Sequence, residues 1–329
     1  SGTVLKGDIG HVRGLTAVPF EVATLGNNHV FDHGLDAFEQ TLSLLTDEGI
    51  HAVGAGMTPT DARQPLVLEV KGLRVALISF SEGEDLTAAD DGAGVFGWEV
   101  AEVVAAVHDI KTTVDIVIVI CHGGVEYIPF PPPYIAAAFQ EIADAGAHLV
   151  IGHHPHVPQG VQIHNQTPIC YSLGNFVFYQ PTDLHYRKVG YLVKAGLASG
   201  SVVSLELIPY SIQEQGLQLL GAAARDSFFE KLEKVSLPLE NFAGIEEAWH
   251  GFMHYYGVEG LKNEIQSILG KMDAELPKGA AMLRNRLTTM QHNRHWIEML
   301  TRIMNNSLAS SPNWAYDLAR EWLTLKRTV

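Results

Sequence analysis

An apolar run at residues 147–151 is followed by a glycine and then by three histidines within four positions, His153, His154 and His156. A short apolar segment that ends in this way is typical of a buried β-strand reaching the edge of a sheet. Side chains alternate along an extended chain, so we expect His154 and His156 to point to the same side. Two imidazoles so placed can hold one metal ion or one ion each of a pair. The alternative is a pair of ordinary surface histidines.

Three other polar blocks also follow predicted strands. They lie at residues 26–34, 122–127 and 172–178, after apolar runs at residues 20–25, 115–121 and 168–171. Loops that follow strands meet along one edge of a sheet in α/β sandwich proteins. The four blocks together therefore predict a single site rich in histidine and asparagine.

The remaining patterns predict an α/β fold, in which helices flank a β-sandwich. Helices are expected at residues 36–48, 99–111 and 133–145, and antiparallel strand pairs at residues 65–80 and 189–209. Residues 81–97 are acidic and rich in glycine, which indicates a long surface loop. From residue 217 onward helical patterns dominate, so we predict two units, a sandwich domain at 1–216 and a helical C-terminal region at 217–329.

Charge is unevenly distributed along the 329 residues. Residues 1–210 hold 9 Lys and Arg against 23 Asp and Glu, whereas residues 211–329 hold 13 against 14. A nucleic-acid groove needs a basic face, so we expect no nucleic-acid partner. An anionic substrate would need bound cations to offset the acidic first part. No apolar run is long enough to span a bilayer, and Cys121 and Cys170 are expected to be buried thiols.

The motifs resemble those of one known family. They are Leu25-Gly26-Asn27-Asn28-His29 with Asp32 and Gly34, Gly54-Ala55-Gly56, His122-Gly123-Gly124-Val125-Glu126-Tyr127, Gly152-His153-His154-Pro155-His156 and Tyr171-Ser172-Leu173-Gly174-Asn175-Phe176. In this order they resemble the CapA family of bacterial capsule and poly-gamma-glutamate synthesis proteins, over about residues 20–210. The resemblance implies a fold like that of the calcineurin-like metallophosphatases and a role in the cell envelope.

The resemblance also implies roles for individual residues. Asn28 and His122 would bind the second metal of a pair, and His154 and His156 would be divided between the two metals. His29 would contact the phosphate, and Asp32 would orient His29. Amide oxygen and imidazole suit a divalent ion such as Mn, Fe or Zn.

Further residues are expected around these ligands. Glu126 and Tyr127 line the substrate cleft or close the loop, and His153 faces away from His154 and supports it from behind. Asn27, Asn175 and Arg187 are also placed in the cleft or behind the ligands, although Asn175 could instead cap the backbone and Arg187 could lie in a solvated turn.

The chain departs from the family pattern at its beginning. The family's first two ligand blocks, a Gly-Asp and an Asn-Leu-Glu, are not found in residues 1–329, and Asp8 does not occupy the position of either. We therefore expect two metals in a complete protein and at most one in this chain.

Two functions follow from these observations. The first is a metal-dependent hydrolase of the phosphoesterase type, acting on a phosphoester or an anionic polymer. The second is a non-catalytic component of a capsule or polyglutamate synthesis and export machine that binds an anionic polymer.

Overall fold

A six-stranded sheet forms the centre of the protein in a computed structural model, which describes residues 4–82 and 92–327. Its strands, in spatial order, are β4 (Leu66–Val70), β5 (Leu73–Ser81), β7 (Ile116–His122), β8 (Leu149–His153), β10 (Thr167–Cys170) and β9 (Val161–His164). The four middle strands run parallel. At the edges, β4 forms an antiparallel hairpin with β5, and β9 forms one with β10. The carboxyl ends of four strands therefore meet at one edge of the sheet.

Two helices cover one face of this sheet. α4 (Val100–Ile110) connects β5 to β7, and α5 (Pro133–Ala145) connects β7 to β8. Val103 and Val107 of α4 pack in one cluster with Phe139 and Ile142 of α5 and with the inward residues of the strands. The central strands are nearly continuous apolar runs because both faces of the sheet are covered.

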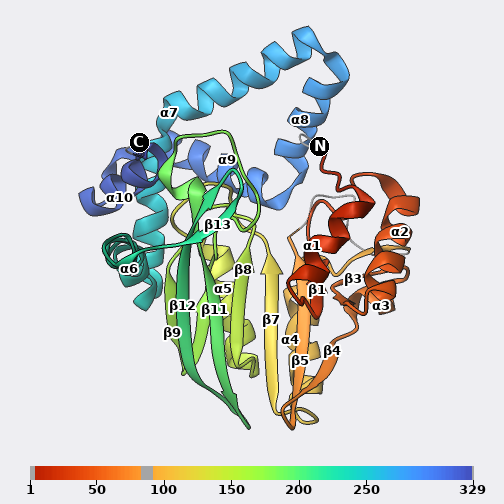
Figure 1. Ribbon diagram of the computed structural model, residues 1–329. Coiled ribbons are helices and arrows are strands. Elements are labelled where there is room, and N and C mark those ends of the chain that lie inside the picture. The colour runs from red at the N-terminus through yellow and green to blue at the C-terminus, as the bar shows by residue number, and fades with distance from the viewer. Residues whose placement is uncertain (1–3, 83–91, 328–329) are drawn as a thin grey trace.

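A second sheet covers the opposite face. It contains β11 (Val189–Ala198), β12 (Ser201–Gln213) and β13 (Gly216–Leu219), and β11 and β12 lie in front of β8 and β9 in Figure 1. Val189 and Tyr191 of β11 share a core cluster with Cys170 of β10, which is buried and free, as is Cys121. The predicted α/β sandwich flanked by helices is confirmed.

β13 corrects the predicted start of the helical region. We expected helix from residue 217, but Leu217 and Leu219 pair with Ile212 and Tyr210 of β12. The physical reason is local, because Gly216 adopts a φ of 139° that closes a tight hairpin and returns the chain along β12. The first helix of the C-terminal region begins at Ala222.

A smaller unit precedes the central sheet in the chain. β1 (Val22–Thr24) and β2 (His51–Val53) form a parallel pair joined by α2 (Gly34–Asp47), preceded by a short 3-10 turn (Ile9–His11) and α1 (Val12–Ala17). β3 (Ala55–Gly56) and β6 (Gly94–Val95) form another pair, with α3 (Pro59–Arg63) between β3 and β4.

The predicted surface loop at residues 81–97 is wrong at both ends. Glu82, Val95 and Phe96 are buried, and Val95 packs in the core cluster of the N-terminal unit with Phe38 of α2. The acidic stretch at residues 83–91, on which the prediction mostly rested, lies outside the described residues.

The C-terminal region is helical, as predicted. It contains α6 (Ala222–Ser236), a 3-10 turn (Leu237–Glu240), α7 (Phe242–Ala274), α8 (Leu276–Thr288), α9 (Met290–Met304), a second such turn (Leu308–Ser310) and α10 (Asn313–Thr324). Gly257 breaks the long α7 with a φ of 62°. In the described part of the chain, no helix combines the length and the apolar character needed to cross a bilayer.

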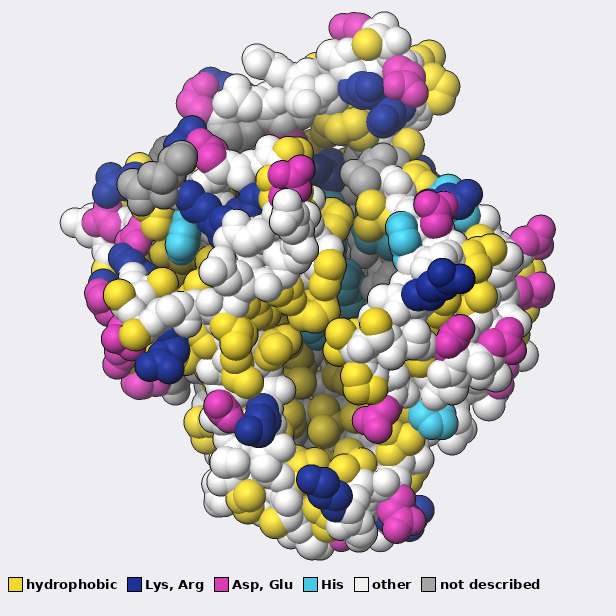
Figure 2. Space-filling model, viewed as in Figure 1, with side chains coloured by type: hydrophobic (Ala, Val, Ile, Leu, Met, Phe, Trp, Pro, Cys, Tyr) yellow, Lys and Arg dark blue, Asp and Glu magenta, His cyan; other side chains and the backbone are white. Residues whose placement is uncertain are grey.

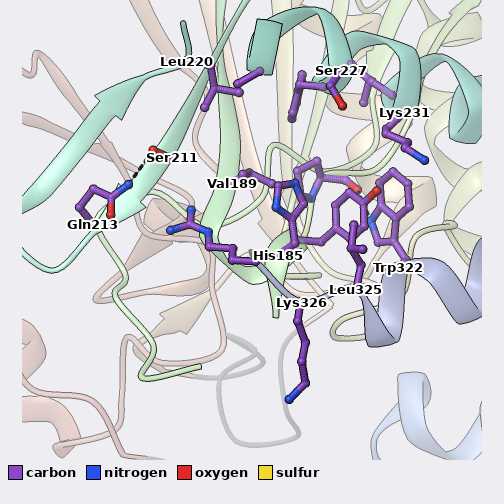
Figure 3. A pocket seen from close by; sticks show the side chains of 16 residues that line it. His185, Val189, Ser211, Gln213, Leu220, Ser227, Lys231, Trp322, Leu325 and Lys326 are labelled. Atoms are coloured by element: carbon purple, nitrogen blue, oxygen red, sulfur yellow. Dashed lines mark hydrogen bonds between the residues drawn. The ribbon is translucent and has the colours of Figure 1, made fainter. Parts of the chain in front are cut away.

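The helices share a core with the sandwich. Trp322 of α10 stacks on Tyr186 with ring centroids 3.6 Å apart, and its indole Nε1 donates to the carbonyl of Pro158 at 3.3 Å. Beside this contact lies a cavity of about 470 Å³, whose lining includes Leu220, Lys231 and Trp322 (Figure 3). The division into domains 1–216 and 217–329 stays a prediction.

Candidate metal centre

Polar side chains from four strand ends converge at the carboxyl edge of the central sheet. His122 is the last residue of β7 and pairs in register with His153 at the end of β8. Asn28 follows β1, and Asn175 follows β10. Figure 2 shows histidine side chains at the bottom of a recess between the N-terminal unit and the sandwich.

One group of ligand atoms centres on His122. Its Nε2 lies 3.1 Å from Oδ1 of Asn28 and 3.1 Å from Nδ1 of His154. Burial lowers the pKa of His122 well below its usual value and that of His154 to about 3, so both imidazoles are neutral at physiological pH. Neutral imidazole is the form that binds a metal.

A second group centres on Glu126. Its carboxylate lies within 4.8 Å of ligand nitrogens of both His154 and His156, and its Oε1 is 3.7 Å from Nε2 of His156. The sequence left Glu126 either lining the substrate cleft or closing the loop, and this geometry makes it a candidate ligand as well. His154 belongs to both groups, and its Nε2 is buried without a hydrogen-bond partner. An orphaned buried nitrogen beside a carboxylate is what a cation site requires.

Asn175 sets the orientation of His156. The amide Nδ2 of Asn175 donates to the carbonyl of Arg187 at 3.2 Å, so its Oδ1 accepts from Nδ1 of His156 at 2.7 Å. Nδ1 of His156 therefore donates to Asn175, and its Nε2 faces Glu126 at 3.7 Å, an arrangement that suits a cation between the two groups. Asn175 thus contacts both His156 and the backbone, so its role behind the proposed ligands stays a prediction beside that of a backbone cap.

The backbone of the histidine block departs from the extended chain that we expected. β8 ends at His153, and His154 and His156 then adopt φ values of 98° and 59°. Such values are uncommon for residues with a Cβ and occur where surrounding structure enforces them, often at functional sites. The two rings still lie close together, with centroids 5.8 Å apart. The expected proximity holds, but a strained turn produces it rather than strand alternation.

His29 forms a separate pair with Asp32. Its Nδ1 lies 2.8 Å from Oδ2 of Asp32, which also accepts the backbone N–H of Leu5 at 2.7 Å. Oδ1 of Asn27 accepts the backbone N–H of His29 at 2.8 Å, so Asn27 shapes the loop. This pairing fixes the ring, and Asp32 has the geometry expected of a residue that orients His29.

Aromatic and basic side chains lie beside His156. The ring of Tyr127 stacks on His156 at 5.6 Å, and the guanidinium carbon of Arg187 lies 3.6 Å from the centroid of Tyr127. Arg187 and Tyr127 therefore form one wall next to the second ligand group. His153 contributes its carbonyl, which accepts from the N–H of Gly123 at 3.0 Å, while burial lowers its pKa to about 4. Within the described ranges, no hydrogen bond links His153 to His154.

Glu82 was missed by the sequence reasoning. Its carboxylate accepts the N–H of Gly124 at 2.6 Å and the hydroxyl of Tyr134, and burial raises its pKa to about 7. These bonds hold the loop between His122 and Glu126 in place. The signal was available, because Glu82 directly follows the apolar strand β5, as the four polar blocks follow theirs.

Helix α9 of the C-terminal region also reaches the site. Its first turn carries Gln291 and His292. The amide of Gln291 raises the pKa of His154, and the imidazole of His292 lowers it. These residues are more than 130 positions from His154 in the chain, and no motif marks them.

The sequence has clear relatives. Residues 3–180 match the family described as bacterial capsule synthesis protein PGA_cap. The PGA biosynthesis protein CapA of Bacillus subtilis is 33% identical over 62% of this chain and 54% of its own length. The capsule biosynthesis protein CapA of Bacillus anthracis is 32% identical over 62% of this chain and 50% of its own. The chain thus spans about half the length of these relatives.

Among solved structures, a 5'-nucleotidase precursor from Thermus thermophilus aligns with a TM-score of 0.39 and 13% identity, over 65% of this chain and 42% of its own. The sequence match is the decisive comparison, since it covers more than half of the chain and all of the strand-end motifs. The resemblance noted in the sequence is confirmed: the chain belongs to the bacterial capsule synthesis protein family PGA_cap.

Proposed function

We propose that this protein acts in the synthesis of a bacterial capsule or of poly-gamma-glutamate and carries a metal-dependent hydrolase site of the phosphoesterase type. The observation that carries the proposal is the position of His154. Its Nδ1 faces His122 at 3.1 Å, and its Nε2 is buried without a partner beside Glu126 and His156. One imidazole thereby belongs to two adjoining groups of ligand atoms.

The residues present fit a divalent cation. Asn28, His122 and His154 would hold it on one side, and Glu126 and His156 on the other. Imidazole with amide and carboxylate oxygen favours Mn, Fe or Zn, and no thiolate is needed. When bound, such an ion polarises the scissile group and supplies an activated water.

His29 is the candidate acid or base. The bond from its Nδ1 to Asp32 fixes the ring and leaves Nε2 as the nitrogen that can exchange a proton with a substrate oxygen. Asp32 would stabilise the protonated imidazole, as a carboxylate paired with a histidine does. In this scheme the metal ligands and the proton donor are different residues.

The substrate class follows from charge. A phosphoester or an anionic polymer would meet a region with a formal charge of −14 over residues 1–210, so the cation and the nearby Arg187 would have to offset this repulsion. A relative from Mycobacterium tuberculosis is named as a probable polyglutamine synthesis accessory protein, which supports an association with other components of such a synthesis.

The test has two measurements on the same purified chain. Elemental analysis after equilibration with Mn, Fe or Zn and dialysis should show bound metal, and bis(p-nitrophenyl) phosphate should be hydrolysed in a metal-dependent way. The proposal would be overturned if the chain showed no bound metal and no turnover. Binding of an anionic polymer without metal or turnover would favour the non-catalytic alternative.

A further inference from the structure

A second cavity lies between the beginning of α5 and one side of α9. Its volume is about 650 Å³. Pro132, Pro133 and Tyr134 form one wall, and Arg294, His295 and Ile297 of α9 contribute to the other. The cleft therefore joins the catalytic sandwich to the helical region, which the family match does not cover.

Arg294 supplies a positive charge that acts on the nearby Tyr134 and Glu82 without forming an ion pair in the described part of the chain. The residue is exposed, and its guanidinium carbon lies 4.7 Å from the centroid of the Tyr134 ring. In the described part of the chain, no carboxylate lies within ion-pair distance of it. The other arginine of the cleft differs, because both Nε and Nη2 of Arg302 bond to Glu298, at 2.9 and 2.8 Å.

His295 supplies a polar atom without a partner. The residue is only 6% exposed, and its ring lies among the rings of Trp249, Phe252 and Tyr256 at centroid distances of 5.0–6.0 Å. Its Nε2 is buried and makes no hydrogen bond. The cleft is thus lined by a guanidinium for which the described residues offer no ion pair, a buried histidine and apolar residues, a composition that suits an anionic group on a larger ligand.

Contacts connect the cleft to the metal centre. Gln291, which lines the cleft, lies one turn before Arg294 on α9 and is close to His154. On the other wall, the hydroxyl of Tyr134 donates to Glu82, which holds Gly124 in the loop between His122 and Glu126. Figure 1 shows α9 beyond the carboxyl end of β7. A ligand in the cleft would contact Tyr134 and hence the residues that hold the loop between His122 and Glu126.

We propose that this cleft is a subsite for an oxyanion of the substrate, a carboxylate or a phosphate, and that Arg294 is its specificity-determining residue. The planar guanidinium offers two parallel N–H donors that match either oxyanion. The link to hydrolysis rests on the proposed function, but binding to the cleft does not depend on it. Arg294 is a binding residue rather than a catalytic one.

Binding of small oxyanions tests the assignment. Calorimetry would measure the affinity of triglutamate, tripolyphosphate and uncharged triglutamine for the wild-type chain and for Arg294→Gln. Arg225→Gln is the matched control, because it removes the same charge from an exposed position on α6. We expect Arg294→Gln to lower the binding affinity for one of the two anions about 10–100-fold, because a charge-assisted hydrogen bond is lost. Arg225→Gln should have no such effect, and Arg294→Lys should restore part of the affinity.

The preferred anion identifies the oxyanion on the substrate. Equal losses in Arg294→Gln and Arg225→Gln would show general electrostatic attraction and overturn the proposal, as would anion binding unaffected by Arg294→Gln, or no binding at all. Metal content should be unchanged in Arg294→Gln, so a failure of the hydrolase proposal would leave the binding result readable. Thermal unfolding of each variant confirms that the fold is intact.

Discussion

The loops at the carboxyl edge of the sheet and the helices after residue 221 meet at one site but contribute different chemistry. The loops contribute imidazole, amide and carboxylate groups from an acidic part of the chain. The helices carry nearly balanced charge and contribute Gln291, His292 and Arg294 of α9. The proposed cation ligands thus come from strand ends, whereas the proposed recognition of an anion is assigned to a helix.

The difference also concerns how each region holds its residues. On the sheet edge, strained turns at His154 and His156 fix the imidazoles. On α9, regular helix geometry places Gln291, Arg294 and His295 on neighbouring turns, since residues three and four apart share a face. Strain can be maintained beside a rigid sheet, whereas the residues on α9 need no strained backbone.

Replacement of His154 should give the largest effect. His154→Ala removes the imidazole shared by both ligand groups, so we expect bound metal to fall to background in elemental analysis. His164→Ala is the control, because this histidine pairs with Asp144 on the surface at 2.9 Å. Smaller but clear losses are expected for His122→Ala and His156→Ala. Full metal content in all three variants would refute the ligand assignment.

Replacement of His29 should separate chemistry from metal binding. His29→Ala should lower kcat by about 10²–10⁴-fold, the usual contribution of a positioned acid or base. Metal content should stay the same, because His29 pairs with Asp32 rather than with the ligand groups. His33→Ala is the control, because His33 is exposed and its loss should leave kcat unchanged. A fully active His29→Ala enzyme would exclude the role.

Replacement of Trp322 tests whether the two regions unfold together. Trp322→Ala would leave a cavity beside Tyr186 and remove the bond to Pro158, so we expect a loss of about 3–5 kcal/mol in the free energy of unfolding. Denaturant titration followed by circular dichroism measures this loss. Trp314→Ala, at a site that is 39% exposed, should cost much less. Two separate transitions in the wild type would show that the shared core does not couple the regions.

Acidification should have a smaller effect, a loss of folding stability caused by the buried His295 of the helical region. Burial lowers the pKa of His295 from 6.5 to about 4. Below pH 6.5 the unfolded chain takes up a proton that the folded state rejects, so stability falls as the pH drops from 6.5 to 4, by at most about 1.4 kcal/mol per pH unit for this group. His295→Gln should flatten this part of the stability curve. His108→Gln, at an exposed position of α4, should leave the slope unchanged. An unaltered slope in His295→Gln would contradict the assignment.

The sequence by itself determined the architecture and the family. Apolar runs followed by polar loops predicted β7, β8 and β10 and placed His122, His154 and Asn175 at their ends, because strand burial and strand termination are local properties of the chain. The motif order pointed to the family that the comparison then confirmed. The predicted helical region was correct except at β13, where a glycine hairpin overrode the helical pattern.

Only the tertiary structure decided how these residues meet. The φ values of His154 and His156, the position of Glu126 beside them and the burial of Glu82 all depend on neighbours distant in sequence. The approach of α9 to His154 was unpredictable for the same reason, since an amphipathic pattern shows that a helix packs but not against what. The residue types at each strand end follow from the sequence alone. The geometry of a site built from four strand-end loops and α9 forms only when the whole core has packed.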